Sequence, residues 1–167
     1  RYTYIQDATA AMYIYDQAGN KTNGLADSMV VSSFIGKLTT YNGMLELIPE
    51  YVGEVLSSDS AISPVEVSLM QLDETYQAKF VKVMNVTFAA GETFGAAHNT
   101  TTYALAESDI LTQIRYRDNE LSGTEIPTTP QNLTALVYQY NTTIELALLK
   151  LEEYVPEPTD CENVPSM

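Results

Sequence analysis

The chain has 167 residues, of which 45% are hydrophobic, and its 22 acidic and 8 basic side chains give a net charge of -14. This length and apolar content suit one folded domain and argue against disorder as a description of the whole chain. The acidic excess disfavours binding to nucleic acid or to an anionic membrane surface, because both need clustered Lys and Arg. The sequence contains no run of eighteen apolar residues, so it predicts no membrane span.

The first 16 residues fit two structures. The pairs Tyr2/Tyr4 and Tyr13/Tyr15 follow the two-residue period of a strand, which favours a short hairpin. The central segment, residues 7–11, is rich in Ala and favours a helix. The segment is therefore ambiguous between helix and hairpin.

The next elements are predicted to be amphipathic helices, over residues 24 to about 41 and 44 to about 56. Asn42-Gly43 lies between them and is a turn signal. Pro49 inside the second pattern predicts a kink or a helix that starts there. A longer helix is predicted from Ser63 to about residue 90, because Ser63-Pro64-Val65-Glu66 has the residues of an N-cap, a first-turn proline and a capping box.

Two further helices are predicted over residues 102 to about 117 and 129–155, the second of which opens with the cap-like pair Thr129-Pro130. The polar segment between them predicts a loop. The expected fold is therefore all-α, an up-and-down bundle of four to five helices over residues 1–155, followed by an acidic, proline-containing tail at residues 156–167. The expected core includes Leu72, Val83, Leu136, Ile144, Leu148 and Leu151.

Five Asn-x-Thr triplets occur in the chain, about threefold more than its composition gives by chance. They predict N-linked glycans and an extracellular or cell-surface location; the alternative is a coincidence in a Thr-rich chain. On a helix Asn85 points away from the apolar stripe, whereas Asn141 lies near a packing seam and is the acceptor least expected to be occupied. The predicted acceptors are Asn20, Asn85, Asn99, Asn132 and Asn141.

Candidates for metal binding or catalysis are few. His98 is the only histidine, so clustered histidine ligands for iron or zinc are absent from the sequence and no cofactor is predicted. Glu46, Glu50 and Glu54 recur every four residues, which on a helix makes a row of carboxylates. A solvated helix face is the simpler interpretation of that row, and a weak cation site is the alternative.

Cys161 is the only cysteine. It follows Pro156 and Pro158 in an acidic segment, where neighbouring carboxylates disfavour a reactive thiolate. A leftover thiol in an oxidising compartment usually finds a partner, which predicts a disulfide to another chain. A free thiol is the alternative.

These features favour a non-catalytic, N-glycosylated extracellular or cell-surface domain that acts through protein–protein contacts, such as a receptor ectodomain, a coat component or a filament subunit. Its expected partners are other protein chains, self-association included, because tyrosine is abundant and exposed tyrosines are common at interfaces. The alternative is a secreted helical carrier with a small apolar ligand in the bundle core. A third reading, an extracellular hydrolase that uses only carboxylates, has the least support.

Overall fold

The computed structural model describes residues 2–89, 91–96, 101–116 and 119–157. Across these residues the chain is built of β-strands, and helix is limited to two short 3-10 turns, Leu69–Gln71 and Glu74–Tyr76. The predicted all-α bundle is therefore wrong. The strands are β1 (Tyr2–Gln6), β2 (Ala11–Tyr15), β3 (Val30–Val31), β4 (Phe34–Tyr41), β5 (Met44–Val52), β6 (Val55–Ser57), β7 (Val65–Val67), β8 (Phe80–Val86), β9 (Thr102–Leu105), β10 (Ser108–Gln113), β11 (Gln131–Tyr140) and β12 (Thr143–Glu153).

Each predicted helix covers strands instead, because spacings of three and four arise by chance in chains that alternate. Val81 and Val83 are buried while Lys82 between them is not, which is the two-residue period of a strand. In β11 the alternation is longer, with residues 131, 133, 135 and 137 buried and those between them less so. Ser63-Pro64 and Thr129-Pro130 precede β7 and β11, so these prolines stand just outside strands rather than in a first helical turn.

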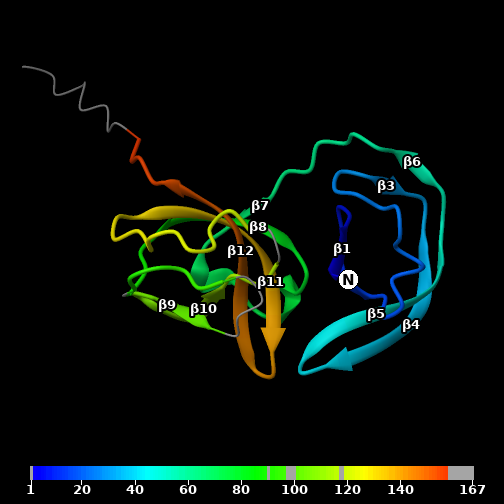
Figure 1. Cartoon of the computed structure of the whole chain (residues 1–167), viewed down its shortest axis with the longest axis horizontal. Helices are drawn as coiled ribbons and strands as arrows, with labels where there is room; N and C mark the ends of the chain where they lie inside the picture. The colour runs from blue at the N-terminus through cyan, green and yellow to red at the C-terminus, as the bar shows by residue number, and fades with distance from the viewer. Residues whose placement is uncertain (1, 90, 97–100, 117–118, 158–167) are drawn as a thin grey trace, which may run out of the picture.

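The N-terminal half contains a four-stranded sheet in the order β1-β2-β5-β4. Strands β1 and β2 form the hairpin that was one of the two alternatives for residues 1–16. Strand β2 pairs in parallel with β5, and β5 pairs antiparallel with β4. Strands β3 and β6 make a small separate ribbon. Figure 1 shows the long β4–β5 hairpin curving around β1, with β4 at the edge of the sheet.

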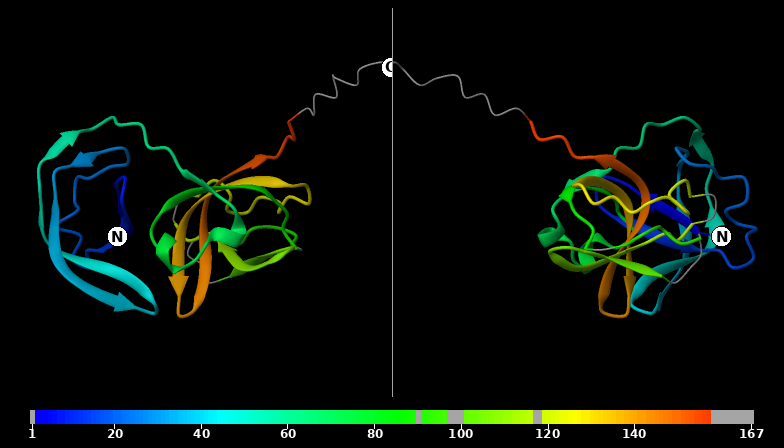
Figure 2. Two further views of the ribbon diagram at one scale, coloured as in Figure 1. Left: turned by 180° about the vertical axis from the view of Figure 1, so that it is seen from behind. Right: turned by 60° about the vertical axis from the view of Figure 1, so that its left-hand side comes forward.

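The C-terminal half is a small closed barrel. Its strands follow the order β7-β8-β11-β12-β10-β9. Beyond the end of β8 the chain pairs with β9: the Ala89 amide donates to Ala104 O at 2.9 Å, the Ala106 amide donates to Thr87 O at 2.9 Å, and Phe88 bridges to Leu105. This pairing joins β9 back to β8 and closes the ring of strands. Figure 2 shows the barrel and the N-terminal half as two lobes that a strap before β7 connects.

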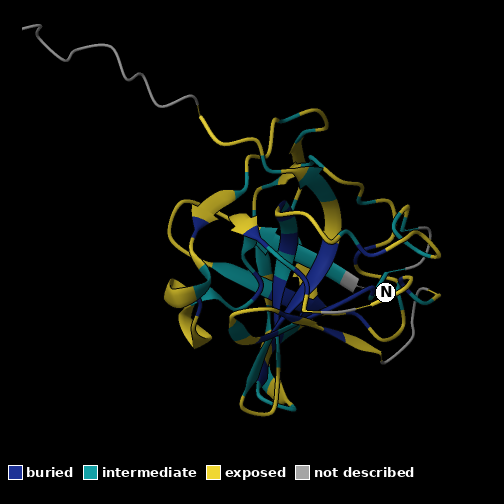
Figure 3. Cartoon of the chain, turned by 90° about the vertical axis from the view of Figure 1, so that its left-hand side faces the viewer, coloured by how far each residue is buried: buried dark blue, intermediate teal, exposed yellow. Residues whose placement is uncertain are grey.

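The main core fills the barrel. Its most buried side chains include Leu133, Val137, Leu146 and Leu148, each 0% exposed, and Figure 3 shows buried residues along the central strands and exposed ones at the hairpin tips. Phe94 packs edge-on against Phe88 and Tyr103, with ring centroids 5.5 and 5.0 Å apart. Of the predicted core residues, the structure buries Leu72, Val83 and Leu148, and it half-buries Leu136, Ile144 and Leu151.

Two hairpin turns hold the halves together. The Asn141 amide, in the β11–β12 turn, donates to Asn42 O at 2.6 Å in the β4–β5 turn. Gln77 joins the same contact: its amide group donates to Gly43 O at 3.1 Å and its oxygen accepts from the Leu45 amide at 2.8 Å. Gly43 has φ +85° and a Cβ there would lie 2.3 Å from Asn141 O, so this contact requires glycine.

Candidate interaction surface

The β4–β5 hairpin is the most exposed apolar element of the described chain, and its turn sets its register. Asn42 and Gly43 both have positive φ values, 48° and 85°, which is the combination that Asn-Gly favours in a two-residue hairpin turn. Tyr41 and Met44 therefore close the hairpin, and the register continues through Leu38 opposite Leu47. The turn predicted from Asn42-Gly43 is confirmed, although it joins two strands and not two helices.

Large apolar side chains of this hairpin are open to solvent on both of its faces. Cross-strand partners share a face, and Ile35 lies opposite Tyr51 while Leu38 lies opposite Leu47. Because Ile35 and Leu38 are an odd number of residues apart, they point to opposite faces. Clusters of exposed apolar side chains on a protein surface often mark interaction sites. The exposed members are Ile35 (56%), Leu38 (57%), Tyr41 (62%), Leu45 (39%), Ile48 (39%) and Tyr51 (54%).

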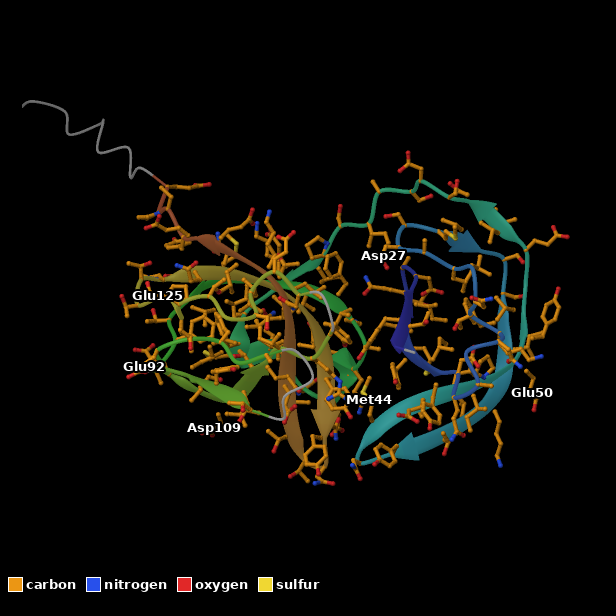
Figure 4. The ribbon with its side chains drawn as sticks, in the orientation of Figure 1. Asp27, Met44, Glu50, Glu92, Asp109 and Glu125 are labelled. Carbon is orange, nitrogen blue, oxygen red and sulfur yellow. The ribbon has the colours of Figure 1, made fainter. Side chains whose placement is uncertain are left out.

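The turn end of the hairpin, in contrast, is covered by the barrel on the side of Met44. Met44 is fully buried in a small cluster with Tyr13, Ala78 and Tyr138. Figure 4 shows Met44 between the two lobes and Glu50 further along β5, directed away from the barrel. The hairpin is thus anchored at its turn and extends its edge strand into solvent.

A polar cluster lies beside this anchor. The Arg115 guanidinium stacks 3.7 Å from the centre of the Tyr138 ring. Glu46 of β5 and Glu145 of β12 are both buried, and the Gln113 side-chain amide donates to the Glu145 carboxylate. Burial raises the pKa of each carboxyl above its usual value, and the Arg115 charge opposes that rise. The cluster therefore brings ionisable groups from both lobes together at a site that is partly shielded from water. Because the protonation of these groups changes with pH, the junction is sensitive to pH.

Two tyrosines complete the junction. The Tyr116 hydroxyl donates to the Tyr4 hydroxyl at 2.7 Å, and the Tyr4 ring lies 5.1 Å from the Tyr13 ring. Burial and then the neighbouring Tyr116 raise the pKa of Tyr4 well above its usual value. These groups form a packed, hydrogen-bonded contact between β1 and the barrel, in which Tyr4 stays uncharged at physiological pH.

The predicted row of Glu46, Glu50 and Glu54 is not formed, because this segment is a strand and not a helix. Four residues span about 13 Å along a strand, so Glu46 and Glu50 lie far apart on β5, and Glu54 lies beyond the end of that strand. Glu46 is buried at the lobe junction, whereas Glu50 and Glu54 are exposed. Within the described ranges no three His, Cys, Asp or Glu side chains are grouped so that they could hold a metal ion.

The glycosylation acceptors within the described residues lie in loops, in turns or beside a bulge. Asn20 is exposed in a loop that Asp16 organises, since the Asp16 carboxylate accepts from the Thr22 amide and hydroxyl at 2.8 and 3.0 Å. Asn85 is exposed with φ 57°, and its amide donates to the Asn132 side-chain oxygen at 3.2 Å. Asn85 and Asn132 are thus neighbours on adjacent strands. The helical argument for the direction of Asn85 no longer applies, because its exposure comes from a β-bulge.

Asn141 is exposed in the β11–β12 turn with φ 55°. Asparagine tolerates such left-handed backbone better than most residues, so Asn85 and Asn141 have a conformational reason to be Asn. Thr22 likewise has a structural partner in Asp16. Part of the excess of triplets is therefore explained without sugar, and glycan occupancy stays a prediction. Asn99, His98 and Cys161 lie outside the described residues.

Open depressions occur on the described surface. One runs between the lobes and is lined by Thr75, Gln77, Lys79 and Gln139 among others. Another lies on the barrel beside Leu69, Asp109 and Thr143. Both are open and lined by polar and apolar side chains together, unlike the enclosed apolar cavity that suits an apolar ligand. Helices of the length and hydropathy that a membrane crossing needs are not found in the described part of the chain.

Comparisons of the chain with protein-family models, with curated proteins and with solved structures found no match. The exposed hairpin and the junction cluster are therefore interpreted from their own chemistry. The sequence did carry a signal for the hairpin, since Asn-Gly between alternating residues indicates a two-residue turn. It carried none for the junction, because Glu46, Arg115 and Glu145 meet only through the tertiary fold.

Proposed function

We propose that this chain is a non-catalytic, N-glycosylated extracellular or cell-surface domain that acts through protein–protein contacts. The observation that carries the proposal is the β4–β5 hairpin, whose exposed side chains include Ile35, Leu38 and Tyr41. A surface of this kind is typical of a binding site on a protein that is otherwise soluble and acidic.

The glycan part of the proposal is supported by the placement of the acceptors. Asn20, Asn85 and Asn141 are exposed and Asn132 is half-buried. Among the acceptors within the described residues, Asn141 is the one whose backbone contacts the other lobe. Asn20 lies in the loop after β2 and Asn85 lies in β8, so neither acceptor belongs to the β4–β5 hairpin.

A two-part experiment on protein from its native source tests the proposal. The intact mass of the protein is measured before and after enzymatic release of N-glycans. We expect the mass to fall by at least that of two N-linked glycans. Cross-linking through the exposed Lys37 of β4, followed by peptide mapping, should join residues 34–52 to another polypeptide. An unchanged mass contradicts the extracellular reading, and cross-links confined to the barrel contradict the binding surface.

A further inference from the structure

Strand β4 presents its outer edge without a neighbouring strand. Strand β4 is the last strand of its sheet, and the two-residue turn places Tyr41 and Met44 in a hydrogen-bonded pair. By alternation Thr39 and Lys37 also bond to β5, while the backbone groups of Gly36, Leu38 and Thr40 point outward. Pro49, which has no N–H, lies opposite Gly36, as expected for a pair without hydrogen bonds.

Charge distinguishes this edge from the rest of the chain. Residues 28–45 contain no Asp or Glu, although the chain has 22. The comparable acid-free segments, residues 75–91 and 126–144, contain the barrel strands β8 and β11, whose alternating side chains such as Val81, Val83 and Leu133 are buried in the barrel core. On β4 the acid-free segment is exposed. Because two copies each carry a net charge of -14, they approach best at a surface without carboxylates.

We propose that two copies of this chain associate through antiparallel pairing of their β4 strands about a two-fold axis at Leu38, a proposal that rests on the function proposed above. Leu38 then lies opposite Leu38 of the second copy, and Ile35 lies opposite Tyr41 of the second copy, in both directions. The three most exposed apolar side chains of β4 thereby all contact apolar partners. Gly36 faces Thr40 and Lys37 faces Thr39.

The alternative register of similar length is less favourable. Backbone hydrogen bonds between the two copies form only where an outward-facing residue of one β4 lies opposite an outward-facing residue of the other. Two positions of the two-fold axis meet this condition with the longest overlap of the strands, one at Leu38 and one at Lys37. The axis at Lys37 sets two lysines directly opposite each other, which costs stability. The axis at Leu38 forms about six new backbone hydrogen bonds without such a pair.

The available area fits a weak, concentration-dependent dimer. The three exposed apolar side chains of β4 present roughly 350 Å² per copy, taking about 200 Å² for a large side chain. A standard interface buries about 800 Å² per partner, and the paired backbone adds to the apolar contribution. Association by edge pairing also removes an open strand edge, which soluble proteins otherwise protect.

Single-cysteine cross-linking of the full chain tests the register, in a Cys161→Ser background. Leu38→Cys places two thiols on the two-fold axis, within the Cα separation that a disulfide spans, whereas Thr40→Cys places them about 13 Å apart, beyond its reach. Thr40 is the matched control, because it lies two residues away on the same face of β4 and its side chain, like that of Leu38, is exposed. With diamide as oxidant we expect a covalent dimer for Leu38→Cys and monomer for Thr40→Cys. Equal cross-linking of both variants, or none for Leu38→Cys, overturns the proposal.

Sedimentation equilibrium supplies a second, independent readout. Thr40→Pro removes an outward N–H and should weaken association at least about tenfold, whereas Thr40→Ala keeps the N–H and should change it less than about threefold. Raising salt from about 0.05 to 0.5 M should strengthen association, because it screens the repulsion between two acidic chains. Circular dichroism checks that each variant is folded.

A chain that stays monomeric at about 100 μM, or that dimerises with Thr40→Pro unaffected, overturns β4 pairing. These failures are distinct from failure of the proposed function. If the protein is a glycosylated monomer that cross-links to a different polypeptide through residues 34–52, the proposed function stands. In that case the partner of β4 is not a second copy of this chain.

Discussion

The two lobes of this protein differ in how the edges of their sheets are paired. The barrel pairs the end of β8 with β9 and so leaves no edge between them. The N-terminal sheet ends at β4, whose edge lies in solvent. The barrel strands are filled by side chains such as Leu133 and Leu148 that are 0% exposed, whereas β4 exposes Leu38 by 57%. The comparison teaches that stability is concentrated in the barrel and that the open sheet is the part available for binding.

Matched leucine truncations should show the largest difference between the lobes. Leu148→Ala removes a fully buried side chain of β12 and should lower the free energy of unfolding by about 2–5 kcal/mol. Leu38→Ala on the β4 edge should change it by less than about 0.5 kcal/mol. Denaturant titration of the two variants at a concentration that keeps the chain monomeric makes the measurement. Equal losses would mean that the lobes do not differ in the way described.

Removing Arg115 should have the next largest effect, because it acts where the lobes meet. Arg115→Met withdraws a positive charge that favours the ionised forms of the buried Glu46 and Glu145. We expect a loss of about 1–3 kcal/mol at pH 7 and a smaller loss near pH 4, where the carboxyls are protonated. Lys21→Met, which removes an exposed positive charge, is the control and should be nearly neutral. A loss that is the same at both pH values would contradict the role given to Arg115.

Stability should also depend on pH in a direction that separates the junction from the surface. The pKa values of Glu46 and Glu145 are raised above 4.5 by burial, so the folded state binds protons more tightly there and gains stability as pH falls from 7 through those values. Asp7 and Asp73 behave oppositely: hydrogen bonds from Thr9 and Thr75 respectively lower their pKa values from 3.8, and their contribution is lost as pH falls below that value.

Melting temperature measured from pH 7 to pH 3 checks this prediction. We expect a rise on mild acidification, then a fall below about pH 4. The double variant Glu46→Gln, Glu145→Gln mimics the protonated cluster, so it should melt higher than the wild type at pH 7 and lose the rise. A steady fall from pH 7 in the wild type would contradict the assignment of raised pKa values at the junction.

The sequence predicted local features better than it predicted the fold. Asn42-Gly43 was correctly assigned as a turn, and Leu72, Val83 and Leu148 were correctly assigned to the core. The helices were wrong because a short window contains both periods: Phe80 and Val83 have a helical spacing, whereas Val81 and Val83 follow the two-residue period of a strand. Which period holds is decided by pairing partners far along the chain, such as Val83 with Leu133.

The candidate surface was only partly within reach of the sequence. Abundant tyrosine suggested interfaces, but Tyr13 and Tyr138 are buried at the lobe junction while Tyr41 and Tyr51 are exposed on the hairpin. Nothing in the order of residues distinguishes these two pairs. The edge position of β4 follows from its being the outer strand of the sheet, which only the topology reveals.

Native-state hydrogen exchange tests most directly the claim that a stable barrel carries an open binding edge. In dilute solution the amides of β11 and β12 should exchange most slowly, through global unfolding, and the outward amides of Gly36, Leu38 and Thr40 should exchange fastest among strand residues. On raising the protein concentration, those three amides should become protected while the barrel amides do not change. Slow exchange of the β4 edge in the dilute monomer, or protection in β11 no greater than in β4, would contradict the account.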